Sequence, residues 1–186
     1  MKIALLPIGN INSDLLERLH ENLDAVFPGT QIAIADEAMP IPEETFDKIR
    51  KQYHADMILD RVFEYAAKEK ALSRVLGIVD VDIFIPELSY VFGKAECPGN
   101  AALISLWRLR PEFYGRSPNV DLFLERAAKE AVHELGHTFG LGHCSNPFCV
   151  MYFSNSIFET DRKQSLFCSK CHLKIEQIMN GVGETS

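Results

Sequence analysis

One stretch of the sequence, HELGHTFGLGHCSNPFCVM at residues 133–151, constrains the fold most strongly, because it gathers three histidines, one glutamate and two cysteines. His133 and His137 are four residues apart, so on a helix their rings lie on one face and can bind one metal ion. Glu134 would point to the side of that ion, where it can accept a proton from a metal-bound water, as in zinc hydrolases. This five-residue pattern alone also arises by chance or on an ordinary surface helix, so the residues that follow it decide between these interpretations.

The residues after His137 predict a third histidine ligand. A straight helix would carry His143 about 9 Å past His137 along the axis, at 1.5 Å per residue. The helix must therefore end, and Gly140 stands where a glycine can adopt the left-handed conformation that reverses the chain. Gly142 is expected to keep the return loop tight. Three neutral imidazoles leave one coordination position open for water, which is typical of a catalytic zinc rather than a structural one.

Four of the five cysteines form two close pairs that predict a second metal site. Cys144 and Cys149 make one pair, and Cys168 and Cys171 make the other. This paired spacing is typical of a structural zinc held by four thiolates. Buried free thiols are the ordinary alternative, and four thiols in two close pairs argue against it. We therefore predict two zinc ions per chain, one catalytic and one structural.

The string CSKCH at residues 168–172 also matches the attachment motif of a c-type haem. Haem attachment requires export, and no export signal is evident; it also leaves the other cysteine pair unexplained. A thiol redox pair is disfavoured on the same grounds. His172 is expected to lie in a final helix without a metal role, and Cys97 to pack as a small apolar residue.

Length and charge limit the remaining function classes. A chain of 186 residues suits a single domain with its own core. The net charge of −7 does not favour binding to nucleic acid or to an anionic membrane. No apolar run approaches the roughly 18 residues that a membrane-spanning helix needs. The start, MKIALLPIGN, indicates a first strand rather than a signal peptide, so we expect a cytoplasmic protein.

Hydrophobic periodicity predicts alternating strands and helices before the histidine motif. Such an order suggests a mixed sheet with helices packed on one face. The expected strands are residues 2–8, 31–35, 74–86, 90–100 and 101–110, and the expected helices are 12–27 and 55–72. A third helix should begin near Ser117–Asn119 and end at about Phe139. Its sheet-facing stripe would consist of Val120, Leu124, Ala127, Ala128, Ala131 and Leu135, with His133 and His137 on roughly the opposite side, lining a cleft.

The extended histidine string followed by Met151 resembles the metzincin clan of zinc peptidases. Within that clan, a cysteine directly after the third histidine, a second cysteine two residues before the methionine and a later C-x-x-C make the chain similar to the archaemetzincin family. The resemblance rests on residues 133–151 and 168–171, about a fifth of the chain. It implies a zincin-like α+β fold: a mixed twisted sheet with packed helices, an active-site helix and a small C-terminal zinc-bound subdomain.

The resemblance also implies a role for each motif residue. His133, His137 and His143 would hold the catalytic zinc, Glu134 would be the general base, and Met151 would form a packed turn beneath the histidines. The structural zinc would be held by Cys144, Cys149, Cys168 and Cys171.

The same resemblance indicates how the chain is organised and what it acts on. Residues 1–142 would form an N-terminal subdomain and residues 143–186 a C-terminal one within a single catalytic domain. A peptide or protein substrate would bind along a strand edge at about Val91 to Cys97. The alternative function is a non-catalytic, zinc-stabilised module that binds peptides or proteins. Glu134 argues against it, because metal binding does not need that carboxylate.

Overall fold

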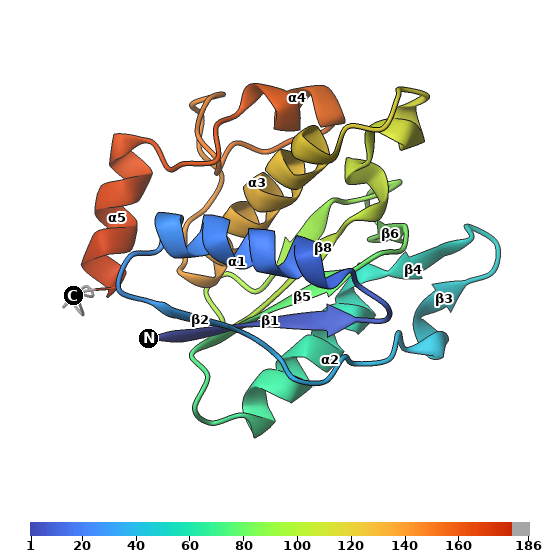
Figure 1. The fold of residues 1–186 in the computed structure, drawn as a ribbon, viewed down its shortest axis with the longest axis horizontal. Helices are drawn as coiled ribbons and strands as arrows, with labels where there is room; N and C mark the ends of the chain where they lie inside the picture. The colour runs from blue at the N-terminus through green and yellow to red at the C-terminus, as the bar shows by residue number, and fades with distance from the viewer. Residues whose placement is uncertain (180–186) are drawn as a thin grey trace.

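The computed structural model describes residues 1–179 and consists of one five-stranded sheet, a small second sheet and helices packed around them (Figure 1). In chain order the elements are β1 (Lys2–Ile8), α1 (Ser13–Val26), β2 (Gln31–Ile34), η1 (Glu43–Thr45), β3 (Phe46–Asp47), β4 (Gln52–His54), α2 (Ala55–Lys68), β5 (Arg74–Val79), β6 (Ile83–Phe84), β7 (Gly93–Ala95), β8 (Ala101–Ser105), η2 (Trp107–Leu109), η3 (Pro111–Tyr114), α3 (Val120–Thr138), α4 (Ile157–Arg162) and α5 (Ser169–Met179). No helix among these is long and apolar enough to span a membrane.

The main sheet has the strand order β2-β1-β5-β8-β7 and mixes two strand directions. The first four strands run parallel to one another, whereas β7 is antiparallel to β8 and forms an edge of the sheet. The strands β1, β5 and β8 are buried on both faces, which explains their nearly continuous apolar sequences. The predicted α+β class with a mixed sheet is confirmed, and the expected edge segment does contain an edge strand.

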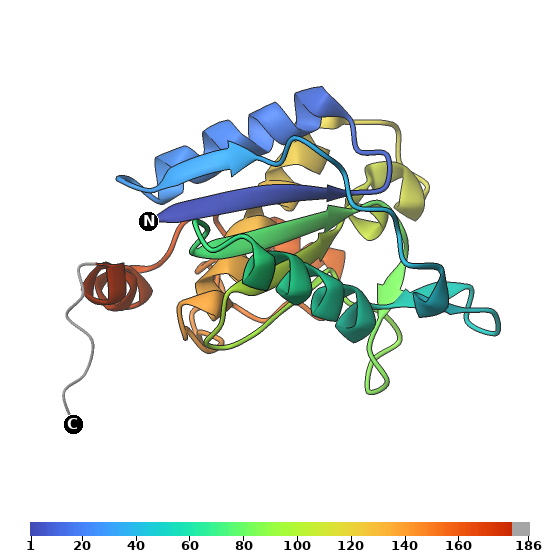
Figure 2. The same ribbon diagram turned by 90° about the horizontal axis from the view of Figure 1, so that it is seen from below.

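The helices cover both faces of the sheet, so the prediction of helices on one face is wrong. Side chains of α1 and α3 share one core, whereas those of α2 belong to a second core. Figure 2 shows α1 and α2 on opposite sides of the sheet. The strand order gives the reason. The chain crosses from β1 outward to β2 and then back past β1 to β5. Two right-handed crossovers in opposite directions place their helices on opposite faces.

The segment predicted as one strand over residues 74–86 is divided between two sheets. β5 ends at Val79, and β6 belongs to the small sheet, of order β3-β4-β6. Between them, Asp80 accepts hydrogen bonds from Arg110, and Asp82 accepts two from Arg108, at 2.6 and 2.7 Å. The ion pairs of Asp80 and Asp82 with these arginines hold the chain at the carboxyl end of the sheet, where it leaves the plane of β5.

Helix α3 begins and ends close to the predicted positions. The side chain of Asn119 caps it by accepting a hydrogen bond from the Leu122 amide at 3.0 Å. Val120 does not face the sheet as expected; it is 63% exposed, because the first turn projects beyond the core. The side of α3 opposite the sheet is also largely covered, since Arg126, Lys129 and Glu130 are buried there. The segment that covers them contains α4, which the sequence did not predict.

Candidate metal and active site

The structure brings the three histidines of the motif together at the C-terminal end of α3. Their ring nitrogens form a set in which the candidate ligand atoms all lie within 4.8 Å of one another. His133 and His137 project from α3, and Gly140 has a φ of +85°, which ends the helix in the left-handed conformation. The amides of Gly140 and Leu141 donate to the carbonyls of His137 and Gly136, which closes the last turn and returns His143 towards the helix.

Hydrogen bonds fix which nitrogen of each helical histidine faces the centre of this set. His133 Nδ1 lies 2.7 Å from the carbonyl oxygen of Val150, and His137 Nδ1 lies 2.7 Å from that of Leu141. Because a carbonyl oxygen only accepts, both Nδ1 atoms carry the proton in these bonds. The two Nε2 atoms then face each other as lone pairs at 3.1 Å. Two lone pairs at that distance repel unless a cation lies between them.

These distances fit a zinc ion. Zn–N bonds of about 2.0–2.1 Å at tetrahedral angles separate two nitrogens by about 3.3 Å, close to the observed 3.1 Å. Burial also lowers the pKa of all three histidines, most strongly that of His133. The buried Lys163 ammonium acts in the same direction on each of them. A neutral imidazole with a free Nε2 lone pair is the form that binds metal.

Met151 is fully buried against the active-site helix. A Cβ placed on Gly136 would overlap the Met151 sulfur, so the absence of a side chain at Gly136 lets the methionine lie directly on α3. Val150, the residue before it, supplies the carbonyl that orients His133. The turn around Met151 therefore supports the histidines through packing and one hydrogen bond, as the resemblance implied.

Glu134 and the three histidines line a cleft of about 460 Å³. Glu134 is buried, and desolvation raises the pKa of its carboxyl group well above the ordinary value. The nearby Glu130 raises that pKa further, whereas the charges of Lys163 and Lys94 oppose the shift. The cleft wall is mostly apolar or aromatic, and residues from three parts of the chain contribute to it, among them Tyr90, Phe92, Gly93, Cys97, Phe153 and Asn155.

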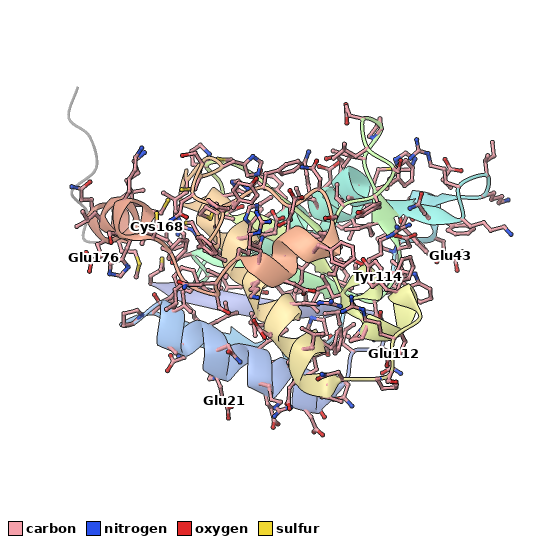
Figure 3. All side chains as sticks on the ribbon, turned by 90° about the horizontal axis from the view of Figure 1, so that it is seen from above. Glu21, Glu43, Glu112, Tyr114, Cys168 and Glu176 are labelled. Atoms are coloured by element: carbon pink, nitrogen blue, oxygen red, sulfur yellow. The ribbon has the colours of Figure 1, made fainter. Side chains whose placement is uncertain are left out.

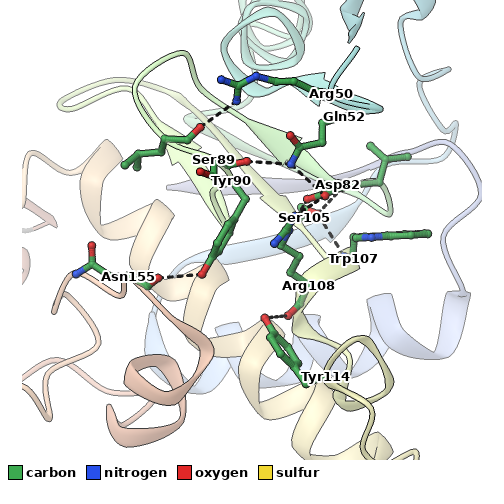
Figure 4. A network of polar contacts seen from close by, with 12 residues as sticks. Arg50, Gln52, Asp82, Ser89, Tyr90, Ser105, Trp107, Arg108, Tyr114 and Asn155 are labelled. Carbon is green, nitrogen blue, oxygen red and sulfur yellow. Dashed lines mark hydrogen bonds and ion pairs between the residues drawn. The ribbon is translucent and has the colours of Figure 1, made fainter. Parts of the chain in front are cut away.

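A polar network holds the wall of the cleft formed by residues 85–95 (Figure 4). Asp82 pairs with Arg108 and also accepts from Gln52, whose amide donates to the Ser89 carbonyl at 3.0 Å. The Tyr90 hydroxyl then donates to the carbonyl of Asn155 at 2.9 Å. That bond joins the strand-edge wall of the cleft to the wall that follows Met151.

A buried ion pair beside Glu134 was not found from the sequence. Glu130 lies one turn earlier on α3, and its Oε1 accepts from the Thr160 hydroxyl at 3.1 Å. Lys163 Nζ approaches the same oxygen to 3.0 Å, with no exposed side-chain surface. The angle of approach is not that of a hydrogen bond, so the contact is ionic. The sequence could have indicated Glu130, because it lies four residues before Glu134 and so on the same face of α3. Nothing in the sequence connects Lys163 to α3.

The four paired cysteines also converge, at the start of α5. Their sulfur atoms all lie within 4.8 Å of one another, and Figure 3 shows Cys168 where the chain enters α5. Cys144 and Cys168 sulfurs are 3.8 Å apart, far beyond the ~2.05 Å of a disulfide. Four thiolates at about 2.3 Å from a tetrahedral zinc would be separated by about 3.8 Å. The convergence of both pairs gives no support to a haem at CSKCH.

Local hydrogen bonds favour thiolates in this cluster. The amide of Cys168 donates to the Cys149 sulfur at 3.3 Å, and the amide of Asn146 donates to the Cys144 sulfur at 3.5 Å. A hydrogen bond from the Cys171 amide lowers the pKa of the Cys168 thiol to about 7. Burial raises the pKa of Cys149 and Cys171, because desolvation disfavours the charged thiolate, and the neighbouring Cys149 raises the pKa of Cys171 further.

Two other candidate residues lie outside both clusters. Cys97 is exposed and lines the cleft, with its thiol 3.6 Å from the Leu141 carbonyl, so the prediction that it packs as an apolar residue is wrong. It follows the edge strand, where the chain has already left the core. His172 lies in α5 as expected and contacts Glu176 at 3.3 Å.

Comparison with known proteins agrees with this geometry. The family model described as "Peptidase family M54" matches residues 5–177. The chain belongs to peptidase family M54. It is 44% identical over 179 residues to the archaemetzincin of Pyrococcus furiosus, covering 94% of this chain and 92% of that protein. The predicted membership of the archaemetzincin family of zinc metallopeptidases is therefore confirmed.

Two solved structures show that the fold is shared along nearly the whole chain. The crystal structure of the Methanopyrus kandleri archaemetzincin superposes with a TM-score of 0.82 at 36% identity, covering 97% of this chain and 96% of that one. A structure described as a zinc-dependent peptidase from Methanocorpusculum labreanum gives a TM-score of 0.84 at 30% identity, with coverages of 93% and 99%. This M54 chain thus has the fold that the resemblance implied.

Proposed function

We propose that this M54 peptidase hydrolyses peptide bonds with His133, His137 and His143 as ligands of a catalytic zinc and Glu134 as general base. The observation that carries the proposal is the pair of Nε2 lone pairs facing each other at 3.1 Å, with both Nδ1 protons engaged by carbonyls. Zinc bound there supplies a Lewis acid for the scissile carbonyl and the attacking water.

Glu134 is proposed to move the proton of the reaction. Its carboxylate lies beside the histidines and lines the cleft, where it can take a proton from the attacking water and pass it to the leaving amine. Its burial raises its pKa, which makes the carboxylate a better proton acceptor than an exposed glutamate. Metal binding by the three histidines does not need a carboxylate at this position.

The substrate is proposed to be an extended peptide or protein segment lying along β7. Phe92 O accepts from Ser105 N, and Glu96 N donates to Ala101 O, so these residues face β8. By the alternation of an antiparallel ladder, the backbone groups of Gly93 and Ala95 then point away from β8, into the cleft. A peptide can add to such an edge through main-chain hydrogen bonds, while the apolar cleft wall receives its side chains.

We further propose that Cys144, Cys149, Cys168 and Cys171 hold a second, structural zinc. The separation of 3.8 Å between Cys144 and Cys168 sulfurs and the amide donors to the sulfur atoms support this. This ion would organise residues 143–186 as a C-terminal subdomain of the catalytic domain; residues 180–186 lie outside the described part of the chain. Free thiolate ligands rather than disulfides are typical of a reducing compartment, and we propose that the protein acts in the cytoplasm.

Substitution of Glu134 by alanine tests the proposed reaction. We expect the variant to retain its histidine-site zinc and its fold but to lose about 10²- to 10⁴-fold in cleavage rate. Glu21→Ala, an exposed carboxylate on α1, is the matched control and should leave the rate unchanged. Cleavage of a peptide library, with metal content measured on the same samples, gives the answer. A Glu134→Ala variant as fast as the parent would exclude Glu134 as the base, and a parent that cleaves nothing would favour the peptide-binding alternative.

A further inference from the structure

Gly93, the first residue of β7, lies directly against the side chain of Glu134. A Cβ added at Gly93 would come within 2.6 Å of both Cγ and Oε1 of Glu134, and within 2.7 Å of the Leu103 carbonyl oxygen. All three distances are shorter than real Cβ contacts. The φ of Gly93 is not positive, so its backbone is one that any residue can adopt. The glycine is required for space rather than for backbone conformation.

The register of the edge strand explains this contact. Gly93 is opposite Ile104 and Lys94 is opposite Leu103 in the antiparallel pair of β7 and β8. Ile104 belongs to the core shared with α3, whereas Lys94 turns to the other face and contacts Asp56 at 3.2 Å. Gly93 is therefore the residue of β7 whose missing side chain would point at the active-site helix, and Glu134 occupies that space.

We propose that Gly93 is a positioning residue for the general base. Without a side chain, the strand leaves room for the Glu134 carboxylate between the histidine cluster and the strand edge. The backbone of the same residue points into the cleft, where the proposed peptide would lie. Gly93 thus lets the base sit directly beside the scissile bond. The inference rests on the proposed function, because it assigns Glu134 the role of base.

Displacement of the carboxylate is the expected effect of any side chain at this position. The contacts with Cγ and Oε1 leave Glu134 no room to remain in place beside a methyl group. A shift of about 1 Å in a catalytic group can lower a rate about 10²-fold. A Cβ at position 93 would also contact Leu103 O. Unlike the contacts with Glu134, this one would strain the pairing of β7 and β8 whatever residue occupies position 134. A test must separate these two effects.

A double-mutant cycle with Glu134→Asp separates them by activity. The shorter aspartate withdraws the carboxylate by one methylene from the space above Gly93. We expect Gly93→Ala to lower kcat about 10²-fold in the parent, with KM and zinc content nearly unchanged. In the Glu134→Asp background the same change should lower kcat less than about 3-fold. Glu21→Ala, an exposed side chain on α1 far from the cleft, is the control and should leave kcat unchanged.

A second cycle, with Glu134→Ala, tests the contact without any activity. Gly93→Ala should lower the melting temperature of the parent, by more than about 3 °C, and should lower that of Glu134→Ala clearly less. The proposal would be overturned if Gly93→Ala lowered the melting temperature equally in the parent and in Glu134→Ala, and also lowered kcat equally in the parent and in Glu134→Asp. Gly93 would then have a role in strand pairing only. Failure of the parent to cleave any peptide would refute the proposed function, while the melting cycle would still decide whether Gly93 places Glu134.

Discussion

Two carboxylates one turn apart on α3, Glu130 and Glu134, lie in opposite electrostatic settings although both are buried. Glu130 has the Lys163 cation at 3.0 Å and accepts a hydrogen bond from the Thr160 hydroxyl at 3.1 Å. Glu134 faces the cleft, and desolvation and the charge of Glu130 raise its pKa. Lys163 therefore pairs with the carboxylate of Glu130, next to the carboxylate that we propose as the general base.

We predict that Lys163→Met destabilises the protein by about 3–5 kcal/mol, because it leaves the carboxylate of Glu130 buried without its cation. Denaturant unfolding monitored by circular dichroism measures the change. The double variant Lys163→Met/Glu130→Gln removes both charges and keeps an acceptor for the Thr160 hydroxyl. It should recover most of the lost stability. A double variant as unstable as the single one would show that Lys163 acts through packing rather than through charge.

At this scale the sequence could identify the candidate metal ligands and the candidate general base, but not the residues that give them space or a neighbouring charge. The histidines, Glu134 and the paired cysteines were found because their spacing follows the helix repeat or a metal-ligand pattern. Gly93 and Lys163 are distant from the motif along the chain. They reach α3 only through the pairing of β7 with β8 and through the packing of α4, and neither can be derived from local sequence.

Among the elements, the end of α3 determines where the third histidine lies. Gly140 adopts a φ of +85° there, whereas Gly142 has no positive φ. A Cβ at Gly140 would lie 3.6 Å from the nearest atom, on Pro98, so the constraint comes from the backbone conformation and not from crowding. The left-handed turn at Gly140 brings His143 back towards His137.

Gly140→Ala should therefore destabilise the protein by about 1–2 kcal/mol, the cost of a left-handed conformation for an ordinary residue. It should also weaken metal binding at the histidine site, since His143 follows the turn. Thermal unfolding and competition with a zinc chelator measure the two effects. Gly142→Ala is the control, and we expect it to change stability by no more than about 0.5 kcal/mol. The interpretation of the turn fails if both variants behave alike.

The sequence predicted long elements well and short ones poorly. The bounds of α1 and α3 follow from Asn12 and Asn119, whose side chains accept hydrogen bonds from Leu15 and Leu122 amides. β3, β4 and β6 are only two or three residues long and exist because they pair with one another. α4 is held by side chains of α3, including Arg126 bound to Asp161. Elements that form because of contacts with other elements leave little hydrophobic periodicity in their own sequence.

Over the whole molecule, the two candidate metal sites share one structural unit. His143 and Cys144 are consecutive, and the Cys144 amide donates to the carbonyl of Met151 at 2.9 Å. Cys149, Val150 and Met151 belong to the same core as α1 and α3, together with Cys171 and Ile175 of the C-terminal helix. The cysteine cluster therefore anchors both the loop that carries the third histidine and the turn that orients His133.

We predict that Cys171→Ser lowers both the thermal stability of the protein and the zinc affinity of the histidine site. Loss of one thiolate would weaken binding of the proposed structural zinc; such binding contributes on the order of 10 kcal/mol to folding in small zinc-finger peptides. A larger core should reduce that dependence here without removing it. The parent should contain two zinc ions per chain, and the variant should lose the cysteine-bound ion first.

The histidine-site affinity must be measured on folded protein, by chelator competition well below the melting temperature of the variant. Cys97→Ser is the matched control, because Cys97 is exposed in the cleft and lies outside the cysteine cluster. It should change neither the zinc content nor the melting temperature appreciably. If Cys171→Ser leaves the zinc affinity of the histidine site at the parental value, the loop that carries both His143 and Cys144 does not couple the two sites. The two sites would then be neighbours in the fold without mechanical coupling.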